Sequence, residues 1–241
     1  MSNSENFPHI RATDALFLDF DGTLAPIQDD PHSVALPVGG ADTLLALAEQ
    51  LDGALAAISG RDIRDLSERL PVEIWRAGGH GVDIVAPGEA PPQSPQTAPG
   101  TLLADVERIT RDFPGTWAES KGPVIAIHYR ASPDAAGALE DALARLLAHV
   151  DGYALQQGKM VMEAKPADAH KGRALESLMA RPPFIGRRPI MVGDDTTDED
   201  AMAAAIRAGG TAIKVGPGET VAPHYLTAPD TVWAWLKGAI D

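Results

Sequence analysis

Short apolar runs alternate with helical patterns at both ends of this chain, and that alternation most limits the folds it can adopt. The first series of strand, helix, strand and helix occupies 15–20, 41–51, 54–58 and 62–70. A second series of helix, strand, helix, strand and closing helix occupies 171–180, 189–192, 198–208, 211–215 and 231–240. Strands separated by helices in this way indicate βαβ units and a parallel sheet. We therefore predict an α/β core built from two separated parts of the chain.

The middle of the chain has a different pattern, which predicts a separate domain. Segment 86–100 contains five prolines and is expected to be a linker or exposed loop. The patterns after it predict helix, strand, strand, helix, strand and strand over 102–113, 116–120, 124–130, 132–150, 153–157 and 159–165. Ser132-Pro133-Asp134 offers an N-cap and a proline at the first position of the second of these helices. We expect an αββαββ insertion with its linker at 86–166, between core parts at 1–85 and 167–241.

Charge and composition exclude several classes of partner. Lys and Arg total 20 and Asp and Glu total 34, a net charge of −14, so bulk charge opposes binding to nucleic acid or to an anionic membrane. The absence of cysteine excludes disulfides and thiolate metal sites. The polar N-terminus and the lack of an apolar run near the roughly 18 residues of a membrane span favour a soluble, cytoplasmic protein. We expect a monomer with a small-molecule substrate.

Two carboxylates directly follow the first predicted strand. Asp19 falls at its carboxyl end, where open α/β sheets bind their ligands, and Asp21 can point into the same crevice as Gly22 turns the chain. Two carboxylates in such a place suit a nucleophile and a general acid/base. The competing interpretation is a pair of turn or helix-cap acids.

A second acidic segment follows the strand at 189–192. Five acids lie within 194–200 and would repel one another without a positive charge among them. A hard divalent cation, Mg²⁺, would relieve this repulsion. Asp194 lies nearest the strand end and is the predicted ligand. The acids from Asp198 to Asp200 are expected to cap the next helix.

Two further motifs can hold an anion. Ser59-Gly60-Arg61 ends the second predicted strand and precedes a helix, so its hydroxyl and N–H groups can bind phosphate at a helix N-terminus. A loop serine and cap would explain the same residues. Lys171, in His170-Lys171-Gly172, is either a phosphate-binding residue or a surface lysine.

The motifs DFDGT, ISGR, HKG and GDD, in this order, resemble those of the haloacid dehalogenase superfamily of phosphohydrolases. The resemblance implies a Rossmann-like parallel-sheet core with an inserted α+β cap of the αββαββ (C2B) type. It implies that Asp19 attacks phosphorus to form an aspartyl-phosphate and that Asp21 protonates the leaving group and later activates water. Mg²⁺ would bind Asp19, the main-chain carbonyl of Asp21, and Asp194. The phosphoryl group would be held by Asp19, Gly22, Thr23, Ser59, Gly60, Arg61 and Lys171, with Asp195 and Asp198 in support.

Spacings within the insertion are similar to those in the cap of trehalose-6-phosphate phosphatases. The similar motifs are Glu119-Ser120-Lys121, His128-Tyr129-Arg130, Gly158-Lys159 and Glu163-Ala164-Lys165-Pro166, together with Gly79-His80-Gly81 and GDDTTDED in the core parts. The resemblance implies trehalose 6-phosphate as substrate, with Glu119, Lys121, Lys159 and Glu163 on the sugar hydroxyls. Arg130 would be a further contact or an inter-strand tether, and His80 a hinge or lining residue. Lys165 stands where the family pattern has arginine, which loses the planar fork.

Other activities remain open at this stage. Phosphatases for sucrose 6-phosphate or mannosyl-3-phosphoglycerate have similar cores, and phosphomannomutases transfer the phosphoryl group back to sugar. A sugar-phosphate sensor without turnover is a different class. Such a sensor often lacks the nucleophile or the acid, whereas Asp19, Asp21, Lys171 and Asp194 are all present.

Overall fold

The computed structural model describes residues 7–28, 30–93, 97–158 and 160–240, and the chain divides into two compact units. The core unit consists of Met1–Pro91 and His170–Asp241, and the cap unit of Pro92–Ala169. The sequence pattern predicts these divisions at 85/86 and 166/167. None of the helices in the described part of the chain is long and apolar enough to cross a membrane.

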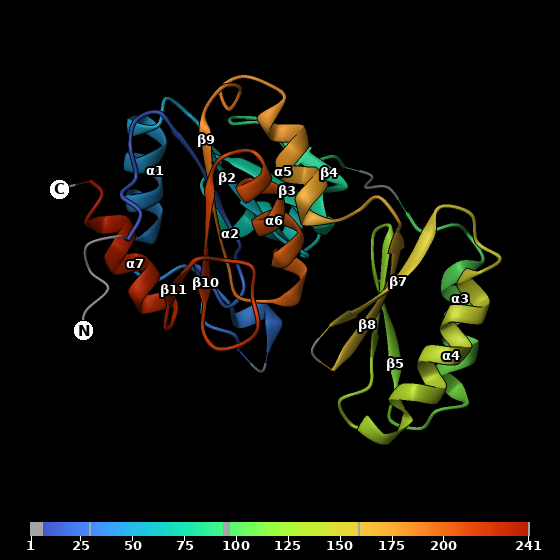
Figure 1. Ribbon diagram of the computed structural model, residues 1–241. Helices are drawn as coiled ribbons and strands as arrows, with labels where there is room; N and C mark the ends of the chain where they lie inside the picture. The colour runs from blue at the N-terminus through green and yellow to red at the C-terminus, as the bar shows by residue number, and fades with distance from the viewer. Residues whose placement is uncertain (1–6, 29, 94–96, 159, 241) are drawn as a thin grey trace. The chain divides into compact units, whose positions relative to one another are not determined.

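The core unit is built on a seven-stranded sheet with the order β11-β10-β9-β1-β2-β3-β4 (Figure 1). All neighbouring strands are parallel except β3 and β4. The strands are β1 Asp14–Leu18, β2 Leu55–Ile58, β3 Trp75–Gly78, β4 Asp83–Val85, β9 Arg188–Gly193, β10 Thr211–Val215 and β11 His224–Leu226. Strands β2, β3 and β4 follow β1 on one side of the sheet, and β10 and β11 follow β9 on the other. The strand order therefore reverses between β1 and β9, which is where such sheets bind ligands.

Helices cover both faces of this sheet. They are α1 Gly40–Gln50, α2 Ile63–Arg69, α5 Lys171–Met179, α6 Glu199–Arg207 and α7 Pro229–Lys237. In Figure 1, α1 and α7 lie together on one side of the sheet, and α5 and α6 on the other. Every residue of β1 is buried, which explains why its sequence, DALFL, is a continuous apolar run after the first residue.

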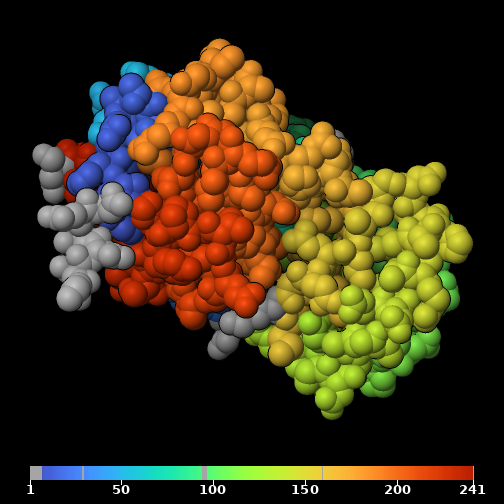
Figure 2. All heavy atoms as spheres, in the orientation of Figure 1, coloured from blue at the N-terminus to red at the C-terminus, as the bar shows by residue number. Residues whose placement is uncertain are grey.

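The cap unit has the element order α3-β5-β6-α4-β7-β8, the predicted αββαββ order. Its antiparallel sheet has the order β5-β6-β8-β7, and its elements are α3 Leu102–Arg111, β5 Trp117–Lys121, β6 Val124–His128, α4 Ala136–Leu147, β7 Tyr153–Gly158 and β8 Val161–Pro166. Ile125, Ile127, Met162 and Ala164 are buried in one cluster with side chains of α3 and α4. The cap unit therefore has its own hydrophobic core. Its outer atoms are mostly yellow and green in Figure 2.

The structure differs from the sequence predictions at several element ends. Ser132 makes no N-cap hydrogen bond, because its hydroxyl donates to the Pro114 carbonyl at 2.8 Å and a 3-10 turn, Pro133–Ala135, precedes α4. The predicted strand at 159–165 begins at Val161, because Met160 has φ 61° and belongs to the turn. The closing helix begins earlier, at Pro229, which suits a first helical turn.

Three strands were not predicted. Strands β4 and β11 have three residues each, too short to show a period. Strand β3 contains Arg76, which is buried because its guanidinium donates to the carbonyls of Ala86 and Glu89. An arginine in a buried strand conceals the apolar run that identifies such strands in sequence.

Candidate active site

The first predicted carboxylate lies at the switch point of the core sheet. Asp19 directly follows β1, and its N–H donates to the carbonyl of Val192 in β9 at 2.9 Å, which ties it between the two central strands. The chain then turns tightly, with Gly22 N–H donating to Ala25 O at 2.7 Å and Ala25 N–H to Phe20 O at 2.9 Å. Gly22 has φ +81°, a conformation that favours glycine. This turn places Asp19 and Asp21 at one end of the sheet.

A buried lysine joins two buried carboxylates. Lys171 begins α5, and its Nζ donates to Asp19 Oδ1 and to Asp198 Oδ1, each at 2.6 Å. All three residues are at most 3% exposed. Lys171 is thus a member of the site and not a surface lysine.

Burial and charge shift the pKa values of this cluster. Burial, reinforced by the charge of Asp198, raises the pKa of Asp19 well above its ordinary value, although Lys171 acts in the opposite direction. Burial alone would lower the pKa of the Lys171 ammonium, but Asp19 and Asp198 raise it overall. Lys171 is therefore a permanent positive charge beside Asp19.

Asp194 follows β9 and lies against the turn at Gly22. A Cβ atom on Gly22 would stand 2.2 Å from Asp194 Oδ2, so only glycine leaves room for this carboxylate. Burial, with the charge of Asp198, raises the pKa of Asp194 to about 6. Lys214 in β10 donates to the main-chain carbonyl of Asp194. Among the described residues, Asp194 Oδ1 is buried and has no hydrogen-bond partner.

Three carboxylates are close enough to share a metal ion. One oxygen from each of Asp19, Asp194 and Asp198 lies within 4.8 Å of the others. Asp198 is already engaged, because its Oδ1 accepts from Lys171 and its Oδ2 from the N–H groups of Asp194 and Asp195, both at 3.0 Å. Asp19 and Asp194 retain oxygens for a cation. A set of hard oxygen donors that includes an unpartnered buried atom fits a divalent cation.

The acids after Asp194 differ in role from the sequence prediction. The predicted cap of the next helix was the run from Asp198 to Asp200. Instead, Asp195 caps the 3-10 turn Thr196–Asp198 by accepting from Thr196 N–H at 2.6 Å. Asp198 completes a capping box and points inward to Lys171. Only Glu199 and Asp200 lie in the first turn of α6.

The Ser59-Gly60-Arg61 loop is held by the turn that contains His80. Ser59 is buried, and its Oγ accepts from Arg61 N–H at 3.1 Å. His80 N–H donates to Ser59 O at 2.9 Å, and Gly79 N–H to Arg61 O at 2.7 Å. A Cβ atom on Gly60 would lie 2.8 Å from His80 Cε1, so the imidazole packs directly on this glycine. His80 therefore supports the loop predicted to bind phosphate.

Arg61 and Thr23 were both predicted to contact phosphate. In the structure the Arg61 guanidinium is paired with Asp21 at 2.6 Å and with Asp65 at 2.7 Å. Burial alone would lower the pKa of Arg61, but these carboxylates raise it. Thr23 is fully buried, and its Oγ1 has no hydrogen-bond partner within the described ranges. That hydroxyl is available to an incoming ligand.

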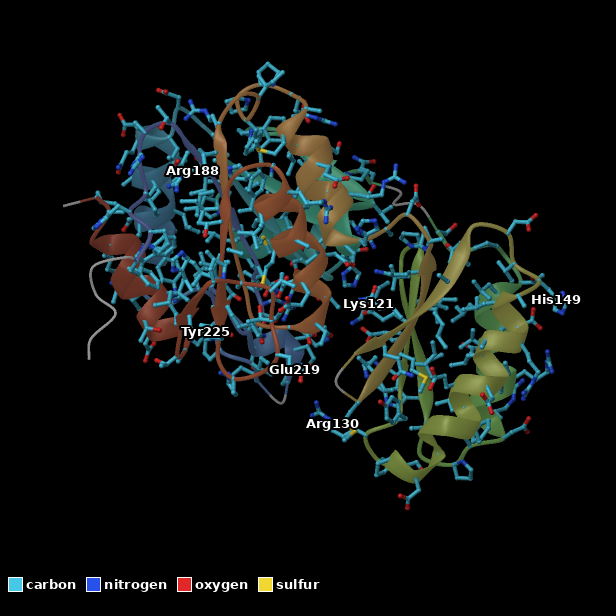
Figure 3. The ribbon with its side chains drawn as sticks, in the orientation of Figure 1. Lys121, Arg130, His149, Arg188, Glu219 and Tyr225 are labelled. Atoms are coloured by element: carbon cyan, nitrogen blue, oxygen red, sulfur yellow. The ribbon has the colours of Figure 1, made fainter. Side chains whose placement is uncertain are left out.

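In the cap unit, the predicted sugar-binding residues of β5 and β8 share the sheet face away from the helices. Glu119 lies opposite Ala126, and Ala126 lies opposite Glu163, while Lys121 Nζ is 3.5 Å from Glu119 Oε2. Figure 3 shows Lys121 and Arg130 on the side of this sheet away from α3 and α4. Arg130 follows β6 and is exposed. Lys159 lies outside the described residues.

Two aromatic residues on this face were not predicted as site residues. His128 Nε2 lies 2.9 Å from Glu119 Oε2, and this hydrogen bond lowers the pKa of Glu119. Trp117 stacks on His128 with ring centroids 4.1 Å apart and remains about half exposed. The period-2 alternation of β5 places Trp117 on the same face as Glu119 and Lys121, and this pattern could have identified Trp117 from the sequence.

We predict that Gly22→Ala abolishes cation binding while the fold is retained. Its Cβ would displace the Asp194 carboxylate. Gly39→Ala is the matched control, because Gly39 has φ +77° but no atom within 4 Å of the added Cβ. Thermal unfolding with and without Mg²⁺ should show a Mg²⁺-dependent rise in Tm for wild type and Gly39→Ala only. A retained rise in Gly22→Ala would contradict the assignment of Asp194.

We predict that Asp194→Asn stabilises the cation-free protein at pH 7.5. Because the pKa of Asp194 is raised from 3.8 to about 6, the folded protein holds a proton that the unfolded chain has released between these values. Stability therefore falls as pH rises through this window, and the full cost, about 2–3 kcal/mol, is present above pH 6.

Urea unfolding in EDTA should show this gain for Asp194→Asn at pH 7.5 and its decline toward pH 4. Asp200→Asn, which changes an exposed acid in the first turn of α6, is the control and should show no gain. With Mg²⁺ present, only the proteins that retain Asp194 should be stabilised. An unchanged or lower stability of Asp194→Asn in EDTA would refute the electrostatic argument.

Known proteins match this chain over nearly its whole length. Residues 17–224 match the trehalose-phosphatase family. The chain is 38% identical over 234 residues to the trehalose-6-phosphate phosphatase of Escherichia coli (strain K12), covering 95% of this chain and 88% of that protein. Its structure resembles the crystal structure of a trehalose-6-phosphate phosphatase related protein, with TM-score 0.73 and 27% identity, covering 94% and 97% of the two chains.

A more distant likeness concerns the fold alone. A haloacid dehalogenase-like hydrolase from Bacteroides thetaiotaomicron superposes with TM-score 0.68 at 15% identity, covering 93% of this chain and 98% of the other. The predicted haloacid dehalogenase fold is thereby confirmed. With a buried aspartate–lysine pair at the switch point of that fold and a family match over most of its length, this chain belongs to the trehalose-phosphatase family.

Proposed function

We propose that this chain hydrolyses trehalose 6-phosphate to trehalose and phosphate, as a Mg²⁺-dependent step of trehalose biosynthesis. The observation that carries the proposal is the buried cluster of Asp19, Lys171 and Asp194 in a member of this family. The enzyme acts on its small-molecule substrate as a cytoplasmic monomer.

Asp19 is the nucleophile. Its Oδ1 accepts from Lys171, so Oδ2 attacks phosphorus, and the bond between phosphorus and the sugar oxygen breaks. Asp21 in its protonated form gives its proton to the departing alkoxide. Asp19, Asp194 and the main-chain carbonyl of Asp21 would hold Mg²⁺, which would neutralise charge on the phosphoryl oxygens. Lys171 adds a fixed positive charge that needs no reorganisation during the reaction.

The phosphoryl group is cradled by the two loops that flank Asp19. The Ser59 hydroxyl and the N–H of Gly60 donate from one loop, which His80 keeps in place. The buried Thr23 hydroxyl and the N–H groups around Gly22 donate from the other. These donors face charge that grows on the phosphoryl oxygens in the transition state.

The second half of the reaction returns the enzyme to its starting state. Asp21, now ionised, takes a proton from water, and the resulting oxygen attacks the phosphorus of the aspartyl-phosphate. The bond from phosphorus to Asp19 breaks, and phosphate leaves with Asp19 again a carboxylate. Asp195 and Asp198 support these steps by fixing the loop of Asp194.

The cap unit recognises the sugar. Glu119, Lys121 and Glu163 present acceptors and donors on one sheet face, and the exposed Arg130 adds positive charge. Lys159, which lies outside the described residues, stays a candidate from the sequence. Mixed donors and acceptors suit a neutral disaccharide, whose hydroxyls need both. The exposed Trp117 ring adds an apolar surface beside them. A phosphatase for another sugar phosphate, or a mutase, would use the same core with different sugar-binding residues in the cap unit.

We predict that phosphate release is fastest from trehalose 6-phosphate. The enzyme should be assayed on trehalose, sucrose, glucose and mannose 6-phosphates, with Mg²⁺ and with EDTA. A preference of about 100-fold in kcat/KM is expected, as is loss of turnover in EDTA and in Asp19→Asn. A flat profile would refute the substrate. Dependence on a sugar bisphosphate without net phosphate release would indicate a mutase, and no turnover at all a sensor.

We predict that Glu163→Gln lowers kcat/KM for trehalose 6-phosphate by about 10- to 100-fold and leaves p-nitrophenyl phosphate hydrolysis unchanged. The amide cannot accept from sugar hydroxyls as a carboxylate does. Glu107→Gln makes the same charge change on an exposed position of α3, within the cap unit, and is the control. Equal losses on both substrates would assign Glu163 a structural role.

A further inference from the structure

We propose that Arg61 is a positioning residue for Asp21 and not a ligand of the phosphoryl group. Arg61 is itself held by Asp65, which Arg69 holds in turn. The inference rests on the proposed function in one respect: it takes as given the phosphatase reaction in which Asp21 exchanges a proton. It assigns a role to the hydrogen-bonded network of Arg61, which precedes α2, with Asp65 and Arg69 of α2. The mechanism above does not use this network.

The Arg61 guanidinium grips both oxygens of Asp21. Its Nε donates to Asp21 Oδ2 at 2.7 Å, and its Nη2 to Asp21 Oδ1 at 2.6 Å. Two parallel hydrogen bonds of this kind fix the plane of a carboxylate as well as its position. The Arg61 side chain is 12% exposed and that of Asp21 is 35% exposed, so the arginine is the more enclosed partner. Asp21 keeps one side open while its rotamer is held.

Arg61 is itself held in place. Its Nη1 donates to Asp65 Oδ2 at 2.7 Å, and its Cζ lies 5.5 Å from the centre of the Phe20 ring. Its Nη2 also donates to Pro31 O at 3.1 Å. An arginine has five N–H donors, and these contacts together with Asp21 engage four of them. Arg61 would have to release Asp21 to grip phosphate with a similar fork.

The chain of alternating charges continues along α2. Arg69, one turn after Asp65, donates to Asp65 Oδ2 at 3.0 Å through Nε and to Asp65 Oδ1 at 2.6 Å through Nη2. Arg69 also donates to the carbonyl of Val34. Asp65 thus lies between the guanidinium groups of Arg61 and Arg69, whose side chains are 12% and 13% exposed. Such a network has few alternative arrangements, so it can hold Arg61, and through it Asp21, in one geometry.

Positioning matters for Asp21 because it must exchange a proton with two different groups. A carboxyl group free to rotate would meet the leaving oxygen in only some orientations, and a displacement of about 1 Å can cost on the order of 100-fold in rate. The fork uses one lone pair on each oxygen, so each oxygen retains another for proton exchange. A lysine at position 61 would keep the charge but lose the fork.

The test measures kcat/KM on aryl phosphates of graded leaving-group acidity and on trehalose 6-phosphate. Because kcat/KM reports formation of the phosphoenzyme, it isolates the step in which Asp21 protonates the leaving group. Arg61→Gln should lose about 10- to 100-fold on the least acidic leaving groups and less than about threefold on p-nitrophenyl phosphate. Arg61→Lys should show the same selective loss. Asp65→Asn, remote from the phosphoryl group, should show it more weakly.

Two comparisons make the result decisive. Arg61→Gln should cost nothing further in an Asp21→Asn background, since the residue acts through Asp21. Arg64→Gln is the control, because Arg64 lies on α2 beside Asp65 but its guanidinium pairs with Asp62 and not with Asp21.

Equal losses across all leaving groups, with weaker inhibition by inorganic phosphate, would make Arg61 a phosphate ligand and overturn the proposal. Additive losses with Asp21→Asn would also overturn it. If Arg61→Gln does not fold, Arg61→Lys and Asp65→Asn answer the same question. Wild-type turnover of aryl phosphates without turnover of trehalose 6-phosphate would refute the proposed substrate, and the aryl series would still test Arg61.

Discussion

The rest of the site depends on one buried lysine shared by two buried carboxylates. Lys171 can balance the charge of only one of the two carboxylates, Asp19 and Asp198. With Asp194 nearby, the cluster therefore has excess negative charge at a largely buried position. Removing Lys171 would leave two buried carboxylates without their cation, at a cost of about 3–5 kcal/mol. A divalent cation would balance this negative charge and so allow an anionic phosphate ester to bind beside it. The raised pKa values of Asp19 and Asp194 express the same imbalance.

The sheet topology is what lets distant parts of the sequence form this cluster. Lys171 is 152 positions from Asp19 and 27 from Asp198, yet it bonds to both. Asp19 follows β1, Asp194 follows β9, and these strands are neighbours with parallel directions, so their carboxyl ends share one edge. The N-terminus of α5 reaches the same edge. The insertion at 92–169 folds as a separate compact unit with a core of its own, so the two core parts still form one sheet.

The sequence allowed the two strand-end acids, the lysine and the order of elements to be predicted, because each depends on local pattern and on the general rule for parallel sheets. It did not distinguish Asp198 from Glu199 and Asp200, since acids at a helix start look alike until one of them turns inward to a lysine. The pairing of Arg61 with Asp21 could not be predicted, because the two residues are 40 positions apart in the sequence. The stacked pair of Trp117 and His128 depends on the pairing of β5 with β6, which single-strand periodicity does not reveal.

The cationic side chains of the core site are already paired with carboxylates or carbonyls of the core unit, and this limits where substrate selection can occur. Arg61 is engaged by Asp21 and Asp65, Lys171 by Asp19 and Asp198, and Lys214 by the carbonyl of Asp194. Because these cations are paired within the core unit, they leave few donors for sugar hydroxyls. Discrimination between sugars therefore falls to groups outside this network. Glu119, Lys121 and Glu163 offer such groups on one face of the cap sheet. Under the proposed function, changes on that face would let the same core chemistry serve different esters.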